Sequence, residues 1–358
     1  MKTPGRKLWA LALVMLLGTG SGLLALAQQQ EPPTEQKQGP IQPKPEDEDK
    51  APYALRVEVP LVEVDVAVID PKSGTFIQGL KKEHFRLYVD GQEQEIAAFA
   101  PTEAPLTTVL VVEASHAFGY LIRYDNLNSA YEFLRLLRKD DWVAVVGYDM
   151  RPRVEADFTH DPREVIGALR AMQYGGFSEA NMYDAIIDTL DRVKDVEGKK
   201  SIIVIGTGID TFSKATWDDA RKVAREHRTT IFCVGTAWPL TMALDRSEVW
   251  GGRVGPERMT INIAEAQMRD LALQTGGRAY FPRFLTEMPG IYGEIGAMLR
   301  NQYTLAFQPK PFKKDGKFHK IEVKLVAPDG KPLKVINQDQ KEIKVEVRAR
   351  QGYYAPES

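Results

Sequence analysis

The sequence predicts an α/β protein with a doubly wound, mostly parallel sheet that is flanked by antiparallel β segments. Three observations lead to this fold class. Short apolar runs alternate with helical patterns in the middle of the chain, residues of alternating polarity precede and follow that region, and turn signals separate the alternating runs. Continuous apolar runs are typical of parallel strands covered by helices on both faces. Alternation is typical of half-buried antiparallel strands.

The middle region supplies the strands and helices of the predicted parallel sheet. The apolar runs are 107–112, 142–148, 201–206, 230–235 and 278–281. Helical patterns cover 131–137, 165–172, 220–227, 263–274 and 287–299. Arg151-Pro152 predicts a hairpin after the second run, so that 153–158 becomes one antiparallel edge strand.

Helix boundaries in this region carry recognisable signals. Asp161 followed by Pro162 is typical of a helix start, and so is Thr216 followed by Asp219. Gly276-Gly277 stops the helix that ends near residue 274.

The flanks on either side predict small antiparallel sheets. Alternating residues form two runs around 55–59 and 62–68, and Asp90-Gly91 is a tight-hairpin signal between 85–89 and the stretch that ends at 96–99. After the last helix, strands are predicted at 303–307, 318–326 and 342–348. Three or four strands in each flank are marginally stable alone. We therefore expect the two flanks to complete one β-sandwich, with the α/β domain inserted between them.

The first residues predict export. A basic start precedes an apolar stretch that ends in Ala25-Leu26-Ala27, which is typical of a cleaved signal peptide. The alternative is a retained membrane anchor, because the apolar run is long enough to span a bilayer. The predicted organisation is a signal peptide at 1–27, a disordered linker at 28–51, an N-terminal β segment at 52–103, an α/β domain at 104–302 and a C-terminal β segment at 303–358. The mature chain is expected in the periplasm or outside the cell, without a membrane span.

Charge and cysteine content limit the choice of partners. The chain has 47 basic and 49 acidic residues, and removing the three basic residues of the signal changes the formal charge from −2 to 44 − 49 = −5. A mildly acidic chain without a basic stripe is not typical of a nucleic-acid-binding protein, so no nucleic acid partner is expected. The single cysteine, Cys233, lies in an apolar strand and is expected to be buried.

The loop after the first apolar run carries a family resemblance. It reads Glu113-Ala114-Ser115-His116-Ala117, and it resembles the Asp-x-Ser-x-Ser loop of von Willebrand factor A-type (VWA) domains. The resemblance covers 107–302 and includes the strand 142–148, Gly175-Gly176 and Tyr183-Asp184-Ala185. The flanks resemble the exported VWFA-related proteins of Acidobacteria. The resemblance implies a secreted or periplasmic binding protein.

The metal-ion-dependent adhesion site that the resemblance implies is altered in this chain. Ser115 is kept, but Glu113 replaces the usual aspartate and Ala117 replaces the second serine. Ala180 stands where the family has a threonine, with Ser178 nearby, and Thr207 stands where it has an aspartate. One carboxylate with hydroxyls is a poor site for magnesium, manganese or calcium.

We therefore predict no functional metal site and no cofactor. The alternative is a relaxed site for magnesium or calcium, built from Glu113, Ser115, Ser178 and Asp210. Asp184 and Asp210 are interpreted as carboxylates at a helix start or at the rim, rather than as metal ligands.

The expected function is non-enzymatic binding or adhesion, with a protein or an extracellular or envelope polymer as the partner. Aromatic side chains on loops at one end of a sheet are typical of a recognition surface. The predicted ligand-binding rim comprises Glu113, Ser115, His116, Phe177, Ser178, Thr207, Asp210, Trp238 and Trp250. A second alternative is a hydrolase that uses Ser115 and His116, although the chain lacks a Gly-x-Ser-x-Gly or His-Glu-x-x-His motif.

Overall fold

The computed structural model describes residues 61–101, 105–115, 133–172, 179–239, 258–327, 329–336 and 342–357, all of which belong to one compact unit. The predicted signal peptide, the linker and the strand around 55–59 lie outside the described residues. None of the helices in the described ranges has the length and hydropathy that crossing a membrane requires.

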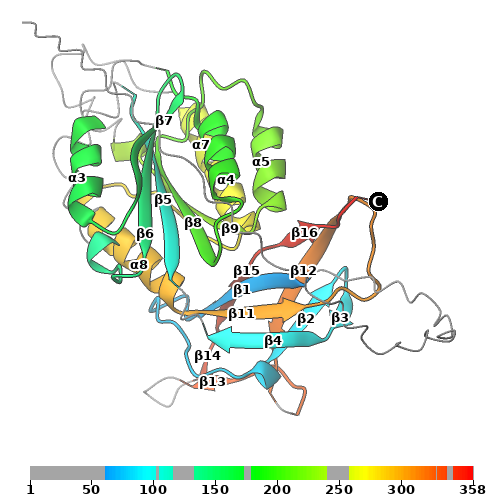
Figure 1. Cartoon of the computed structure of the whole chain (residues 1–358). Coiled ribbons are helices and arrows are strands. Elements are labelled where there is room, and N and C mark those ends of the chain that lie inside the picture. The colour runs from blue at the N-terminus through cyan, green and yellow to red at the C-terminus, as the bar shows by residue number, and fades with distance from the viewer. Residues whose placement is uncertain are drawn as a thin grey trace, which may run out of the picture. The chain divides into compact units, whose positions relative to one another are not determined.

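A six-stranded sheet with the order β10-β9-β8-β5-β6-β7 forms the α/β domain (Figure 1). Its strands are β5 (Leu106–Glu113), β6 (Trp142–Tyr148), β7 (Pro152–Thr159), β8 (Lys199–Gly206), β9 (Thr229–Gly235) and β10 (Ala279–Tyr280). All neighbours pair in parallel except β6 and β7, which pair antiparallel. The predicted fold class and the antiparallel edge strand are confirmed.

Helices cover both faces of this sheet. On one face lie α3 (Pro162–Ala171) and α8 (Met288–Arg300), and on the other lie α4 (Met182–Val193), α5 (Trp217–Glu226) and α7 (Arg258–Gln274) (Figure 1). The start signals act as predicted. Asp161 caps α3 by accepting a hydrogen bond from the Arg163 amide, and Thr216 and Asp219 form a reciprocal capping box at α5.

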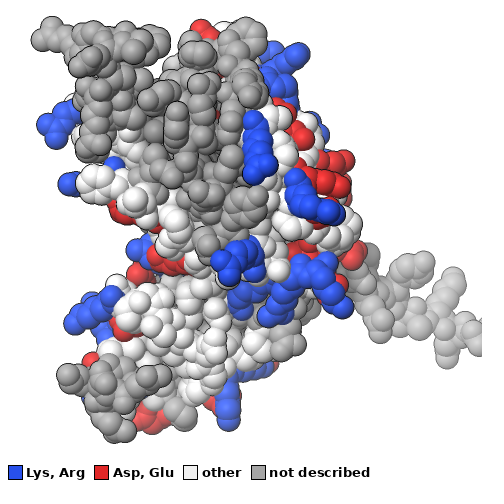
Figure 2. Space-filling view, turned by 90° about the vertical axis from the view of Figure 1, so that its left-hand side faces the viewer, with Lys and Arg blue, Asp and Glu red and all other residues white. Residues whose placement is uncertain are grey.

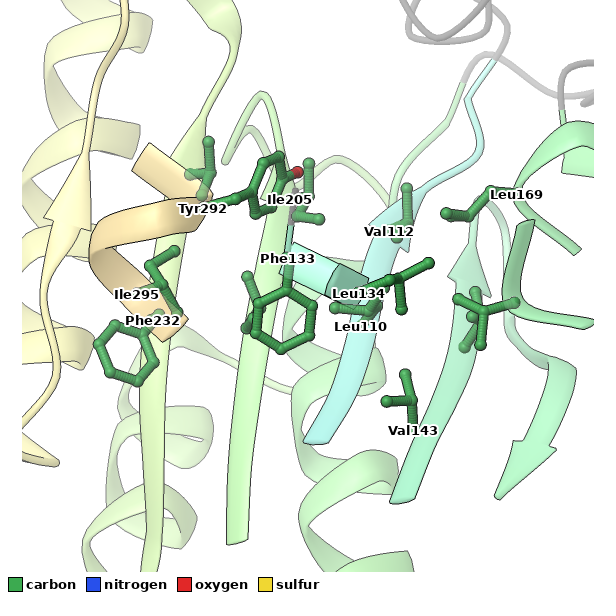
Figure 3. Close-up of a cluster of buried hydrophobic side chains, with 14 of the residues drawn as sticks. Leu110, Val112, Phe133, Leu134, Val143, Leu169, Ile205, Phe232, Tyr292 and Ile295 are labelled. Carbon is green, nitrogen blue, oxygen red and sulfur yellow. The ribbon is translucent and has the colours of Figure 1, made fainter. Parts of the chain in front are cut away.

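The apolar side chains of the sheet pack against α3 and α8 in one continuous core (Figure 3). Tyr292 and Ile295 of α8 lie over Ile205 and Phe232 of the sheet, and all four side chains are buried. The predicted helix at 131–137 begins outside the described residues. Its Phe133 is buried in the same core. Such two-sided burial explains why the strands read as unbroken apolar runs.

The flanks combine into two four-stranded sheets, β15-β1-β11-β4 and β16-β12-β2-β3. Their strands are β1 (Val62–Ile69), β2 (Phe85–Val89), β3 (Gln92–Gln94), β4 (Ile96–Pro101), β11 (Gln302–Phe307), β12 (Phe318–Leu325), β15 (Glu346–Ala349) and β16 (Gly352–Tyr354). Each sheet contains strands from both flanks, and β1, β11 and β4 lie side by side in Figure 1. One buried apolar cluster joins the two sheets into a sandwich.

Two details of the flanks differ from the predictions. Asp90 and Gly91 do form a tight turn, with φ values of 48° and 83°, but the turn joins β2 to β3. The stretch predicted as its partner is divided: its first part is β3, which does pair with β2, and its end, 96–99, belongs to β4 and pairs with β11 in the other sheet. The predicted strand 342–348 is divided into β14 (Glu342–Ile343), which pairs with β13 (Val335–Ile336), and β15. Alternation identifies a strand but not its partner, which the register of the whole sheet decides.

Asp141 is buried where three elements of the α/β domain meet. Its carboxylate accepts hydrogen bonds from the Leu106 amide at 2.8 Å, from the Arg138 amide at 2.5 Å and from the Arg300 guanidinium of α8. Burial alone would raise the pKa of Asp141, but these donors outweigh it and hold the pKa below its usual range.

We expect Asp141→Ala to lower the free energy of unfolding by about 3 kcal/mol, because it leaves the Arg300 charge and two amides without their acceptor. Urea denaturation measures the change. The control is Asp140→Ala, which removes the adjacent, exposed carboxylate and should leave stability nearly unchanged. Equal effects of the two substitutions would show that the buried pair does not stabilise the fold.

Candidate functional site

The carboxyl ends of the parallel strands meet at one edge of the sheet. Glu113 ends β5 and pairs with Tyr148 at the end of β6, while Gly206 of β8 pairs with Gly235 of β9. Ligand groups of doubly wound sheets gather outside this edge. The predicted residues of the first loop and of the loop after β8 are therefore brought together here.

Glu113 is buried at this edge, with 3% of its surface exposed. Its Oε1 accepts a hydrogen bond from the Ser115 hydroxyl at 2.7 Å. Its Oε2 accepts two hydrogen bonds from Thr207, from the amide at 2.6 Å and from the hydroxyl at 2.8 Å. The carboxyl group therefore ties the end of β5 to the loop after β8.

The protonation of Glu113 is shifted by its surroundings. Burial raises the pKa of Glu113 above its usual value, and the negative charge of Asp210 adds to the rise. The hydrogen bonds from Ser115 and Thr207 act in the opposite direction but do not outweigh burial. The site therefore favours the neutral carboxyl group more than water does.

Tyr148 and Gly206 complete the space around this carboxyl group. The Tyr148 side chain is fully buried, and its hydroxyl has no hydrogen-bond partner among the described residues. Burial, followed by the nearby Glu113 charge, raises its pKa well above the usual value. A Cβ atom at Gly206 would lie 2.4 Å from the Tyr148 hydroxyl and 2.7 Å from Glu113 Oε2. The glycine thus leaves the room that both side chains occupy.

Asp210 and Asp184 hold the start of α4 and the loop after β8. Asp210 Oδ2 accepts hydrogen bonds from the Tyr183 amide at 3.0 Å and from the Ser213 hydroxyl at 2.6 Å, and its Oδ1 accepts one from the Ser213 amide at 3.1 Å. The two Asp184 oxygens each accept a backbone amide at 3.0 Å. Their interpretation as carboxylates of a helix start agrees with this geometry.

The described residues fit a divalent cation poorly. Magnesium and calcium need carboxylate oxygens that can turn toward the ion. Both oxygens of Glu113, Asp210 and Asp184 instead accept hydrogen bonds from the protein. In the described part of the chain, no three His, Cys, Asp or Glu residues gather in a way that could hold a metal. Ser178, the fourth member of the predicted relaxed site, lies outside the described residues.

Of the remaining residues of the predicted rim, the structure describes Ser115 and Trp238. Ser115 is 2% exposed and donates a hydrogen bond to Glu113, so its oxygen does not face solvent as a nucleophile would. Trp238 follows β9 at the same edge, half-buried, with the Arg258 guanidinium 5.8 Å from its ring. His116, Phe177, Ser178 and Trp250 lie outside the described residues.

Three residues at this edge were not predicted from the sequence. Tyr148 and Gly206 were included only as ends of strands. Phe212 follows Asp210 in the loop after β8 and leaves 48% of its surface exposed. Its amide and that of Thr211 both donate to the Ala180 carbonyl, at 3.0 and 2.8 Å, so the loop that presents the ring is fixed. The sequence signal that could have identified Phe212 is its place in the same loop as Asp210, a predicted rim residue.

The fold and this edge define a class of protein: a doubly wound α/β domain that is inserted in a β-sandwich. The carboxylates at its carboxyl edge accept hydrogen bonds from the protein itself. No family model matches the chain, and no curated protein matches it. Similar solved structures include a von Willebrand factor type A protein from Catenulispora acidiphila, with 12% identity, a TM-score of 0.42, and 79% of this chain and 76% of that chain covered.

Two further solved structures belong to this comparison. BatB from Bacteroides thetaiotaomicron is 15% identical, with a TM-score of 0.42, and the match covers 55% of this chain and 100% of that chain. The PilB minor pilin from Streptococcus sanguinis is 8% identical, with a TM-score of 0.40 and coverage of 56% and 63%. Likenesses at this level say nothing about the partner or the site.

We expect Glu113→Gln to remove a pH dependence of stability. A raised pKa means that the folded state holds the Glu113 proton more tightly than the unfolded state does. The stability contributed by the protonated group is therefore present at low pH and is lost as the pH rises through the pKa of the folded state. Glutamine can still accept from Thr207 and can donate to Ser115. Urea denaturation from about pH 4.5 upward should show the wild type losing stability relative to the variant, by at most about 1.4 kcal/mol per pH unit. Parallel curves would contradict the raised pKa.

We expect Gly206→Ala to lower the free energy of unfolding by about 1–3 kcal/mol, because the added methyl group displaces the Tyr148 hydroxyl and the Glu113 carboxyl group. Thermal unfolding measures the change. The control is Gly167→Ala in α3, where nothing lies within 4 Å of the added Cβ atom and the higher helix propensity of alanine should raise stability. A neutral Gly206→Ala would show that this space is not needed.

Proposed function

We propose that this chain is an exported, non-enzymatic binding protein that recognises a protein or an envelope polymer without a metal ion at the carboxyl edge of its sheet. The observation that carries the proposal is the engagement of the edge carboxylates. The carboxylate oxygens of Glu113, Asp210 and Asp184 all accept hydrogen bonds from within the fold. A cation would have to compete with these donors for the carboxylate oxygens.

The proposed contact surface is the aromatic rim, which we define as Phe212 and Trp238. Both follow the carboxyl ends of neighbouring strands, β8 and β9. Aromatic side chains on a fixed scaffold bury much surface at a small cost in entropy, which suits them to recognition. Figure 2 shows acidic and basic side chains interspersed with uncharged ones over the described part of one face.

The absence of catalysis is part of the proposal. A serine hydrolase needs an accessible hydroxyl next to a base. Ser115 is buried and donates its hydrogen bond to Glu113, an arrangement that supports a structural role.

The metal part of the proposal is tested by thermal unfolding of the full chain with magnesium, manganese or calcium against EDTA. A ligand that binds only the folded state raises the melting temperature by mass action. We expect the same melting temperature in all four solutions. A rise of several degrees with any of the cations would support the relaxed metal site instead.

The rim is tested by sedimentation with isolated cell-envelope material in the presence of EDTA. We expect Phe212→Ala and Trp238→Ala each to weaken association about tenfold, as expected for a central aromatic contact. The control is Trp142→Ala, which removes an aromatic ring that is 41% exposed at the start of β6, on the opposite edge of the sheet. Equal losses for the three variants would contradict the assignment of the rim.

A further inference from the structure

The outer face of α7 is apolar, although this helix lies at the surface. Its inner face packs on the sheet through buried residues such as Met268 and Leu271. On the opposite side, Met259, Ile263 and Leu273 leave 67%, 52% and 49% of their surfaces exposed. A surface helix of a globular protein normally turns polar side chains to solvent, and a helix that is apolar on both sides is normally covered.

These exposed residues form a continuous row together with Ala266, which is also exposed. At 3.6 residues per turn, all four positions fall within about 80° of the helix circumference. From first to last they extend over about 21 Å at 1.5 Å per residue. We call this row the apolar stripe, and it consists of Met259, Ile263, Ala266 and Leu273.

The neighbouring helices of the same layer have charged outer faces. Ion pairs between residues one turn apart join Asp188 to Arg192 in α4, and Asp218 to Arg221 and Lys222 to Glu226 in α5. Such pairs keep a helix surface in contact with water. The apolar stripe is therefore a property of α7 and not of the helices that cover this sheet in general.

The apolar stripe is symmetric about its own centre. Met259 and Leu273 each lie seven positions from Ala266. In an antiparallel pair of α7 helices with a two-fold axis at Ala266, Met259 of one copy thus meets Leu273 of the other. The small side chain at the axis lets the two helices approach closely. Two-fold contacts are self-complementary in this way, and they are the commonest contacts of soluble oligomers.

The charges beside the stripe favour an antiparallel pair. Glu265 and Arg269 lie on the same flank of α7. Across the two-fold axis, Glu265 of one copy is within about 3 Å, measured along the helix, of the level of Arg269 of the other. Opposite charges then face one another twice. In a parallel pair, each of these charges and that of Asp270 would face its own copy and repel it.

We propose that a second copy of this chain covers the apolar stripe, through an antiparallel, two-fold pair of α7 helices. Two single helix faces bury less than the usual area of about 800 Å² per partner, so we expect a dissociation constant roughly in the micromolar range.

The pairing has a consequence for the aromatic rim, although it does not depend on that surface. The Arg258 guanidinium lies 5.8 Å from the Trp238 ring, which places the amino end of α7 beside the rim. In an antiparallel pair the two rims therefore lie at opposite ends of the paired helices. Such a dimer would join two binding surfaces instead of doubling the contact with one.

Sedimentation equilibrium of the full chain from about 1 to 300 µM tests the proposal. We expect a monomer–dimer equilibrium that Ile263→Glu weakens more than tenfold, because the variant places an unpaired charge in the contact. The matched control is Val154→Glu, which changes an apolar side chain of β7 that is 43% exposed and should leave the dimer intact. Thermal unfolding verifies that both variants are folded.

Cysteine cross-linking under mild oxidation locates the axis, and the native Cys233 is buried and does not interfere. Ala266→Cys should form a disulfide-linked dimer, because the axis brings this position next to its own copy. Met259→Cys and Leu273→Cys should cross-link with each other when mixed, and not when each is alone. The control is Thr260→Cys, which is exposed on α7 outside the stripe and lies about 18 Å along the helix from its own copy.

Four results would overturn the proposal. They are a monomer at every concentration, a dimer that Ile263→Glu leaves unchanged, equal cross-linking of Thr260→Cys and Ala266→Cys, and cross-linking of Met259→Cys alone. The last result would indicate a parallel pair.

Discussion

The burial of one carboxyl group, that of Glu113, governs the carboxyl edge of the parallel sheet. A buried carboxyl group needs hydrogen-bond donors, and here the donors come from the fold itself, from Ser115 and Thr207. The extra methylene of glutamate, compared with aspartate, carries the group across to the loop after β8. Gly206 is the residue that leaves space for this crossing. The two oxygens of the Glu113 carboxyl group serve as internal cross-links between the end of β5 and the loop after β8.

The sequence was sufficient to predict the strands of the α/β domain, but it did not predict how the strands of the sandwich pair. Strands such as 142–148 and 230–235 are buried on both faces, so each residue in them is apolar or small and the run stands out. The strand β4 was recognised by its alternation, but its partner was not. The choice between β2 and β11 depends on contacts across about 200 residues, on which local pattern has no bearing.

The position of the candidate site could be predicted from the sequence, but its hydrogen bonds could not. The resemblance placed Glu113, Ser115 and Thr207 at one edge, and the structure joins them directly. Tyr148 could not be identified as part of this group, because a tyrosine at the end of an apolar strand is equally suited to ordinary packing.

The antiparallel pairing of β4 with β11 has a consequence for how this architecture could arise and be modified. Pro101, the last residue of β4, stands opposite Tyr303 near the start of β11, so the chain leaves the sandwich and returns to it one strand spacing away, about 5 Å. The whole α/β domain therefore occupies the place of a hairpin loop. A short turn could bridge the same two residues, and the sandwich is thus a host into which, or from which, an entire module can be exchanged without altering the order of its strands.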